Sequence, residues 1–280
     1  MPEFETLSHF SALLENRDLS TVVEANAICN RAGMDTITAG STLACYAEIE
    51  GRRLAPGEIL RLLRDISLGR GEGWRLGAGS WRYAADRGAP EASVSVKKLE
   101  LPAYDPRGAY GMALAYAVST RGGCHLRAYP ISHEILRKPV VTDRLSFSGK
   151  ARIVKIAEDA NAAIDSLSVC KFSFFGASLE EYARACSAVT GEEVSAQDLV
   201  GCGERIVYRE RVMNAMNGFD STDDDLPARF FRVPGSSGVW GETPAMDRTG
   251  FLDARSRYYR IRGLDGDGRP TPEKTRELGL

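Results

Sequence analysis

Two six-residue segments share a pattern of residue types that can carry chemistry. Residues 30–35 read Asn-Arg-Ala-Gly-Met-Asp, and residues 165–170 read Asp-Ser-Leu-Ser-Val-Cys. Each has an acid or amide first, a small residue fourth, an apolar residue fifth and a potential ligand sixth. Carboxylate and amide oxygens accept hydrogen bonds, and a thiolate binds metals. The same residue types also cap helices and form turns, so the pattern alone leaves both interpretations open.

The cysteines outside this motif do not form a recognisable metal site. The chain has six: Cys29, Cys45, Cys124, Cys170, Cys186 and Cys202. No two of them form a Cys-x-x-Cys pair, whereas a cubane iron–sulfur cluster needs four thiolates. Scattered cysteines in a chain without an export signal are also unlike a disulfide framework. By spacing alone we expect buried structural cysteines, Cys170 included.

Hydrophobic periodicity predicts a mostly helical chain. The expected helices cover residues 20–31, 35–51, 58–68, 109–120, 150–167, 179–190 and 195–216, with another from Thr271-Pro272. Ser20, Asp35 and Ser195 are expected to cap helices, and Gly33, Gly69 and Gly191 to end them. Only residues 92–99 alternate as a strand does, and residues 219–249 read as a long loop. We expect two helical lobes, residues 1–145 and 146–280.

Composition excludes several classes of protein. The formal net charge of the 280-residue chain is −2, so no basic field points to a nucleic-acid partner. The first fifteen residues hold three glutamates and no lysine or arginine, which is unlike a signal peptide. The longest nearly apolar run, 109–118, is too short to cross a bilayer. These observations predict a cytoplasmic protein that binds neither nucleic acid nor membrane.

The motifs together resemble the tungsten-dependent aldehyde ferredoxin oxidoreductase family. The resemblance rests on ordered segments along the whole chain: Pro2–Leu7, Cys29–Ile37, Glu100–Gly108, Ser119–Arg127, Asp225–Phe231 and Tyr258–Leu280. It implies the all-α, two-lobed C-terminal region of such an enzyme, without the N-terminal β domain. The reaction implied is the oxidation of an aldehyde with water to a carboxylate.

The resemblance assigns the two motifs to cofactor binding. Asn30, Asp35 and Asp165 would contact a tungsten (or molybdenum) bis-pyranopterin, whose donor edge suits these acceptors. Cys170 would be one ligand of a [4Fe-4S] cluster. Asn30 replaces the family's usual aspartate and keeps an acceptor. Ser168 replaces a usual glycine, which puts the backbone of the second loop in question.

The resemblance also implies two catalytic residues. Glu5 matches the second glutamate of a Pro-Glu-aromatic-Glu segment, and His125 follows Arg-Gly-Gly-Cys. A carboxylate beside the metal can orient or deprotonate the attacking water, and an imidazole can donate to the aldehyde oxygen as charge builds there. Glu24 is a weaker candidate.

The implied partners follow from what the chain lacks. An N-terminal half or a separate subunit would bring the Cys-x-x-Cys-x-x-x-Cys cluster ligands, and ferredoxin would take the electrons. The substrate would be a small aldehyde. Two alternatives stay open: a non-catalytic helical subunit or remnant, and a related tungsten-dependent acyl or ring reductase.

Overall fold

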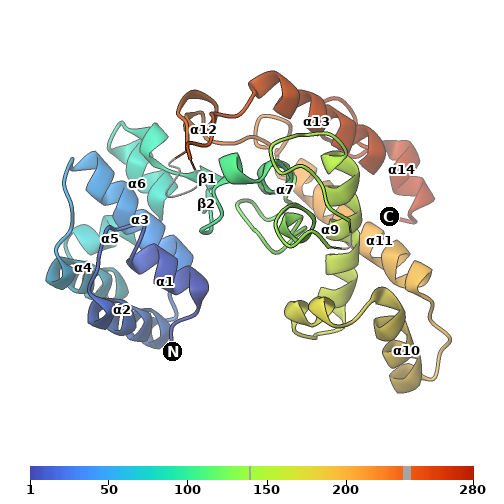
Figure 1. Ribbon diagram of the computed structural model, residues 1–280, viewed down its shortest axis with the longest axis horizontal. Helices are drawn as coiled ribbons and strands as arrows, with labels where there is room; N and C mark the ends of the chain where they lie inside the picture. Colours follow the sequence, from blue (N-terminus) through green and yellow to red (C-terminus); the bar gives the residue numbers. More distant parts are fainter. Residues whose placement is uncertain (139, 236–240) are drawn as a thin grey trace. The chain divides into compact units, whose positions relative to one another are not determined.

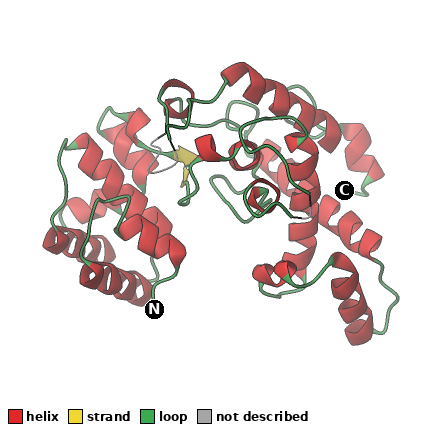
Figure 2. Ribbon diagram, in the orientation of Figure 1, coloured by secondary structure: helices red, strands yellow, loops and turns green. Residues whose placement is uncertain are grey.

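The fold is built almost wholly from helices. The computed structural model describes residues 1–138, 140–235 and 241–280 (Figure 1). In this part of the chain the only sheet is an antiparallel hairpin of β1 (Ser95–Val96) and β2 (Leu99–Glu100) (Figure 2). The predicted all-α class is therefore confirmed. The expected strand over residues 92–99 is a short 3₁₀ turn followed by the first strand and the tip of this hairpin.

The chain forms two compact units. Unit 1 comprises residues 1–104, 121–124 and 226–232, and unit 2 comprises residues 105–120, 125–225 and 233–280. These units do not follow the expected boundary at residue 145. The reason is the apolar helix α7 (Tyr110–Val118), which is buried on every side and packs on α9 and α13 of unit 2.

Unit 1 is a cluster of helices with one apolar core. Its helices are α1 (Phe4–Phe10), α2 (Leu19–Ala32), α3 (Thr36–Ile49), α4 (Pro56–Leu68), α5 (Glu72–Leu76), α6 (Ser80–Asp86), the 3₁₀ helix η1 (Pro90–Ala92) and α12 (Arg229–Arg232). Phe10, Val22, Leu43 and Ile59 are among the buried core residues, and they come from α1 to α4. The core thus joins the helices that carry the first motif.

Most of the predicted helix ends in unit 1 are correct. Gly33 and Gly69 end α2 and α4 in the left-handed conformation, and Asp35 caps α3 by accepting from the amide of Thr38 at 2.7 Å. The cap predicted at Ser20 is wrong. Asp18 caps α2 instead, because its carboxylate accepts from both the amide and the hydroxyl of Ser20.

Unit 2 is arranged around the long helix α9 (Lys150–Ser166). It also contains η2 (Pro106–Gly108), α7, α8 (Ile131–Glu134), η3 (Lys171–Phe175), α10 (Leu179–Thr190), α11 (Ala196–Met216), α13 (Arg248–Arg262) and α14 (Pro272–Glu277). Helix α9 packs against α7, α11 and α13 (Figure 1). The caps at Ser195 and Thr271 are as predicted, and Gly191 ends α10.

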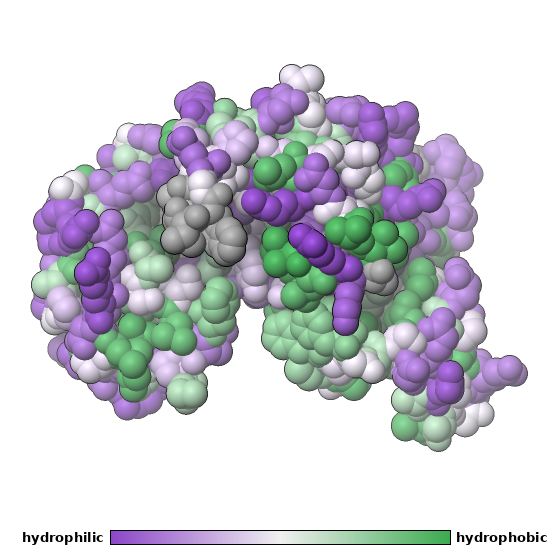
Figure 3. Space-filling view, in the orientation of Figure 1, coloured by the Kyte–Doolittle hydropathy of each residue, from purple (hydrophilic) through white to green (hydrophobic). Residues whose placement is uncertain are grey.

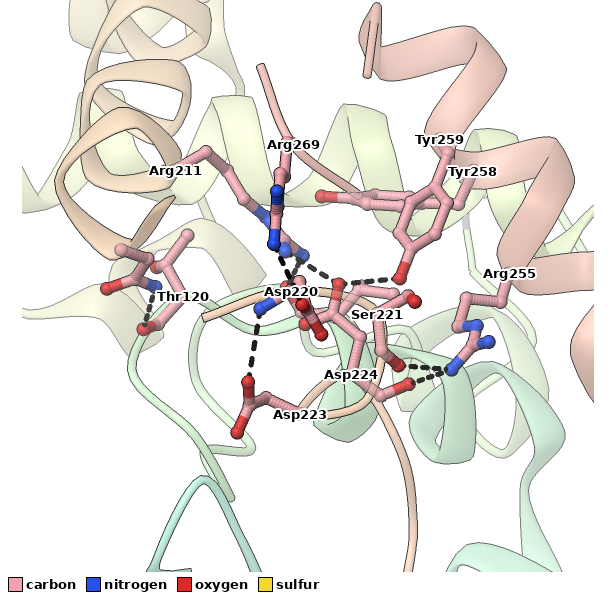
Figure 4. A network of polar contacts seen from close by, with 12 residues as sticks. Thr120, Arg211, Asp220, Ser221, Asp223, Asp224, Arg255, Tyr258, Tyr259 and Arg269 are labelled. Carbon is pink, nitrogen blue, oxygen red and sulfur yellow. Dashed lines mark hydrogen bonds and ion pairs between the residues drawn. The ribbon is translucent and has the colours of Figure 1, made fainter. Parts of the chain in front are cut away.

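A buried polar network ties α11 and α13 to the segment that connects them. The Arg211 guanidinium pairs with Asp224 at 2.6 Å, and the Tyr259 hydroxyl donates to the same carboxylate at 2.9 Å (Figure 4). Arg255 donates to the carbonyl oxygens of Ser221 and Asp224. This network fixes part of the region 219–249 that reads as a loop. That region also contains α12, and its residues 236–240 lie outside the described residues.

Close packing of α9 on α11 requires a glycine at position 203. A side-chain carbon there would overlap the carbonyl oxygen of Asp159, whereas one at Gly201 would meet no atom within 4 Å. We expect Gly203→Ala to lower the free energy of unfolding by about 1–3 kcal/mol through overpacking. Gly201→Ala, the matched control, should raise it by about 0.5–1 kcal/mol, because alanine favours a helix more than glycine does. Urea denaturation of both variants measures this, and equal effects would contradict it.

The described helices also bear on the membrane prediction. Within residues 1–138, 140–235 and 241–280, no helix combines the length and the apolar character that crossing a bilayer demands.

Candidate functional site

The first motif forms an exposed loop between α2 and α3 in unit 1. Asn30, in the last turn of α2, has an exposed side chain, and its carbonyl accepts from the amide of Gly33. Gly33 is left-handed with φ +67°, and no heavy atom lies within 4 Å of the position a Cβ would take. The Asp35 carboxylate uses one oxygen to cap α3 and has acceptor capacity beyond it. Capping and ligand binding are therefore compatible at this loop.

Glu5 lies near the first motif and is buried, although it is close to the chain end. Its side chain accepts from the backbone amide of Ala103 at 2.9 Å, and His9 Nδ1 lies 3.6 Å from the same oxygen. Burial is the main effect that raises the pKa of the Glu5 carboxyl. The Ala103 amide and His9 lower it, and the charges of Glu3 and Asp35 raise it. A buried carboxyl with a raised pKa has the properties of a general base.

The raised pKa of Glu5 predicts a pH-dependent stability difference. A carboxyl whose pKa is higher in the folded protein than in the unfolded chain favours folding at low pH, and this contribution is lost as pH rises through the folded pKa. We expect Glu5→Gln to melt at a higher temperature than wild type at neutral pH. The advantage should shrink as pH falls towards 4. Melting curves from pH 4 to 8 measure it, and a lower melting temperature at neutral pH would contradict the prediction.

Two adjacent glycines position the segment before His125. In unit 1, a Cβ at Gly122 would lie 2.6 Å from the carbonyl oxygen of Val96, and one at Gly123 would lie 2.6 Å from that of Leu99. The amide of Gly123 donates to the Val96 carbonyl at 3.2 Å. The backbone therefore lies flat on the β1–β2 hairpin, which a larger residue would prevent. His125 follows two residues later, in unit 2.

A lysine links the second motif to the residues after His125. The ammonium of Lys171 donates to Asp165 at 2.8 Å and to the carbonyl of Leu126 at 2.8 Å. The Asn161 amide nitrogen, on the same helix as Asp165, reaches the Ala128 carbonyl at 3.1 Å. Sequence reasoning did not find Lys171, although it directly follows Cys170. Within unit 2, the predicted residues Asp165 and His125 thus lie on segments that are bonded together.

The fourth residue of the second motif has a positive φ, as the fourth residue of the first does. Ser168 is left-handed with φ +57°, so it adopts the conformation of Gly33 at the equivalent position. Asp165, Ser168 and Cys170 are exposed. The interpretation of Cys170 as a buried structural cysteine is therefore wrong. That interpretation is correct for Cys29, whose burial raises the pKa of its thiol to about 11.

The two loops fit the predicted cofactor in their donor chemistry. Each presents an exposed acid or amide beside a left-handed residue, and the second adds an exposed thiol that can ligate iron. Among the described residues no three His, Cys, Asp or Glu side chains gather as a metal site would require. Cys170 contributes one possible ligand. The loop of Asn30 and Asp35 lies in unit 1 and the Asp165 loop in unit 2.

Helix α11 supplies a clamp on the chain around His125 that sequence reasoning missed. The Glu210 carboxylate accepts from the Thr120 hydroxyl at 2.5 Å and from Arg127 at 3.1 Å. The Asn214 side chain donates to the Thr120 carbonyl at 2.8 Å. Glu210 therefore fixes residues on both sides of His125. Glu24, the weaker candidate, forms exposed ion pairs with Arg31 and Arg64. No periodicity signals the clamp, because its partners are about ninety residues apart.

Comparison with known proteins identifies a family over the whole chain. The sequence model described as aldehyde ferredoxin oxidoreductase, domains 2 & 3, matches residues 1–280. The tungsten-containing aldehyde ferredoxin oxidoreductases of Pyrococcus furiosus and Thermococcus kodakarensis are each 38% identical to this chain over 297 aligned positions. The alignments cover 100% of this chain and 48% of each relative. The chain therefore spans about half the length of these curated relatives.

A more distant sequence relative and one solved structure also match the chain. The WOR-like subunit of an aliphatic sulfonate oxidoreductase from Pyrococcus furiosus is 24% identical, over 100% of this chain and 46% of its own length. The solved active-site complex BamBC of benzoyl coenzyme A reductase, bound to 1,5 dienoyl-CoA, superposes with a TM-score of 0.73 at 17% identity. That match covers 100% of this chain and 49% of the solved chain.

Proposed function

Because the chain belongs to the aldehyde ferredoxin oxidoreductase family, we propose that it forms the helical part of an enzyme that oxidises an aldehyde to a carboxylate, with water supplying the added oxygen and two electrons passing to an acceptor. The observation that carries the proposal is the pair of exposed loops with the same left-handed backbone at Gly33 and Ser168. Each loop would present hydrogen-bond acceptors to the ring of a bound pterin. The relatives of 38% identity are tungsten-containing oxidoreductases, which supports a tungsten cofactor here.

The cofactor would be held from both motifs. Asn30, Asp35 and Asp165 would bind the bis-pyranopterin by accepting from its donor edge, and Cys170 would provide one thiolate to a [4Fe-4S] cluster. The chemistry that this group supplies when bound is a two-electron oxidation, with the electrons leaving to ferredoxin. The metal would be tungsten, with molybdenum as the alternative.

Two residues of this chain would act on the reactants. Glu5 would hold the attacking water and take its proton, a role that suits a buried carboxyl with a raised pKa. His125 would donate a hydrogen bond to the aldehyde oxygen as negative charge develops on it. Lys171 and Glu210 would act as positioning residues, since Lys171 bonds the Leu126 carbonyl and Glu210 bonds the side chains of Thr120 and Arg127 on either side of His125.

The remaining cluster ligands would come from another polypeptide segment. A cubane cluster takes about four thiolates, and Cys170 is one. An N-terminal half or a separate subunit with a Cys-x-x-Cys-x-x-x-Cys run would supply the others. This agrees with a chain that spans about half the length of its relatives.

Anaerobic purification from the native host tests the proposal. Copurification with further cysteine-rich sequence, with about four iron atoms and one tungsten per complex, would support it. Aldehyde-dependent reduction of ferredoxin would then identify the reaction. A metal-free chain would instead favour a non-catalytic helical subunit. A loaded complex that reduces an acyl or ring substrate and oxidises no aldehyde would favour the reductase, an alternative motivated by the fold shared with BamBC.

A further inference from the structure

A buried histidine lies beside the Glu5 carboxylate in unit 1. His9 follows Glu5 by one turn of α1, and its Nδ1 lies 3.6 Å from Glu5 Oε2. His9 and Glu5 are 2% and 5% exposed, beneath a surface of unit 1 that mixes hydrophilic and hydrophobic side chains (Figure 3). Water therefore screens the interaction between them only weakly. We call these two residues the His9–Glu5 pair.

Both nitrogens of the His9 ring face backbone carbonyl oxygens. Nδ1 lies 2.7 Å from the carbonyl oxygen of Glu5, and a carbonyl oxygen can only accept, so Nδ1 carries a hydrogen. Nε2 faces the carbonyl oxygen of Leu101 at 3.5 Å. With a hydrogen on each nitrogen, the ring would donate to both carbonyls and would present a positive charge to the Glu5 carboxylate.

Close packing of α1 on α3 holds the imidazole in this position. A Cβ at Gly40 of α3 would lie 2.6 Å from the Cβ of His9, so the two helices meet at the base of the histidine side chain. The Thr6 hydroxyl donates to that of Thr36 at 2.9 Å, which attaches α1 to the start of α3. Asp35 of the first motif directly precedes Thr36. The imidazole is thus fixed against the helix that begins at the first motif.

Opposing effects act on the ionisation of the Glu5 carboxyl. Burial is the largest effect and raises its pKa, and the charges of Glu3, just before α1, and Asp35, just before α3, raise it further. The amide of Ala103, which donates to Oε2 at 2.9 Å, and the charge of His9 act in the opposite direction. An imidazolium at His9 therefore favours the ionised form of Glu5, which is the form that can accept a proton.

We propose that His9 is a positioning residue for Glu5, whose carboxylate its imidazolium holds in place and in the ionised form. The inference rests on the proposed function of Glu5 as the base, and it adds the residue that keeps this base ready to accept a proton. His9 would act only through Glu5, because both ring nitrogens face carbonyl oxygens of the protein. Its effect would appear at acidic pH, since at higher pH the Glu5 carboxylate is ionised without its help.

An NMR titration of the metal-free chain tests the inference without turnover. With ¹³C at the glutamate carboxyl carbons, the Glu5 signal is the one that Glu5→Gln lacks. We expect its titration midpoint to move to higher pH in His9→Asn, whose amide can still donate where Nδ1 does but carries no charge. His9→Gln removes the same charge and replaces His9→Asn if that variant does not fold. His133→Asn is the matched control, because His133 Nδ1 faces the Val140 carbonyl at 3.2 Å in unit 2, and it should leave the midpoint unchanged.

The pH profile of the assembled enzyme gives an independent measurement. We expect kcat/KM of His9→Asn for acetaldehyde to fall about threefold or more at about pH 5.5 and to change less than about twofold at about pH 8. A histidine with a merely structural role would lower it by the same factor at both. A uniform fall, or an unmoved Glu5 midpoint, would overturn the inference. A moved midpoint together with a loaded wild-type complex that oxidises no acetaldehyde or other aldehyde would support the coupling within the His9–Glu5 pair and refute the proposed function.

Discussion

Replacing Arg262 with methionine is expected to lower the free energy of unfolding by about 3–5 kcal/mol, because the buried Glu158 carboxylate would lose its paired cation and Asp159 would keep only Lys155, at 2.7 Å. The side chain is fully buried on α13 and pairs with Asp159 and with Glu158, the latter at 2.7 Å. It also donates to the Lys155 carbonyl at 3.1 Å. Burial already raises the pKa of Glu158, and the charge of Arg262 is the largest opposing effect. Removing it leaves the Tyr258 hydroxyl, at 2.6 Å, as a neutral donor to Glu158.

A second arginine on the same helix is the matched control. Arg257 is exposed and pairs with Asp253 at 2.8 Å, one helical turn away. Its replacement by methionine should cost no more than about 1 kcal/mol, because water screens and solvates both charges. Urea denaturation of the two variants with wild type measures the difference. Similar losses for both would mean that the buried pairs contribute no more than a surface pair.

Helix α13 also shows where the sequence patterns are insufficient. Its five arginines, over residues 248–262, interrupt the apolar periodicity from which a helix is predicted, and no helix was predicted there. The stabilising contacts are ion pairs to residues about a hundred positions away, which no local pattern encodes. Helices with local signals were predicted well. Gly69 and Ser195 mark the ends of α4 and α11 because their conformations depend on neighbouring residues alone.

The candidate site also contains some residues that the sequence predicts and others that it does not. The repeated motif predicts two similar loops, and the left-handed Ser168 matches Gly33 although serine rarely adopts that conformation. The exposure of Cys170 follows from its place in such a loop. Lys171 and Glu210 could not be predicted, because their contacts join residues 45 and 83 positions apart in the sequence. Motifs therefore point to candidate ligand-binding residues more readily than to the residues that would position them.

Replacing His125 with asparagine should lower turnover of the assembled enzyme by about 10²–10³-fold, the usual effect of losing a donor to a developing oxyanion. Tungsten and iron contents should remain at wild-type levels, because the proposed cofactor contacts are on other residues. The fold should also hold, because Glu210 fixes Thr120 and Arg127 independently of the imidazole. Steady-state kinetics and metal analysis of one preparation measure both quantities. Unchanged turnover would assign His125 a structural role.

Cys170→Ser is the comparison for His125→Asn, because we expect it to lower the iron content as well as the activity. Serine is a poor ligand for iron compared with a thiolate, so the iron content should fall together with activity. The exposed position of Cys170 means that this change should leave the melting temperature of the metal-free chain unchanged. If His125→Asn loses turnover but keeps its metal, and Cys170→Ser loses both turnover and iron, then His125 acts on the substrate and Cys170 holds the cluster. Loss of metal in both variants would instead show that His125 supports cofactor binding.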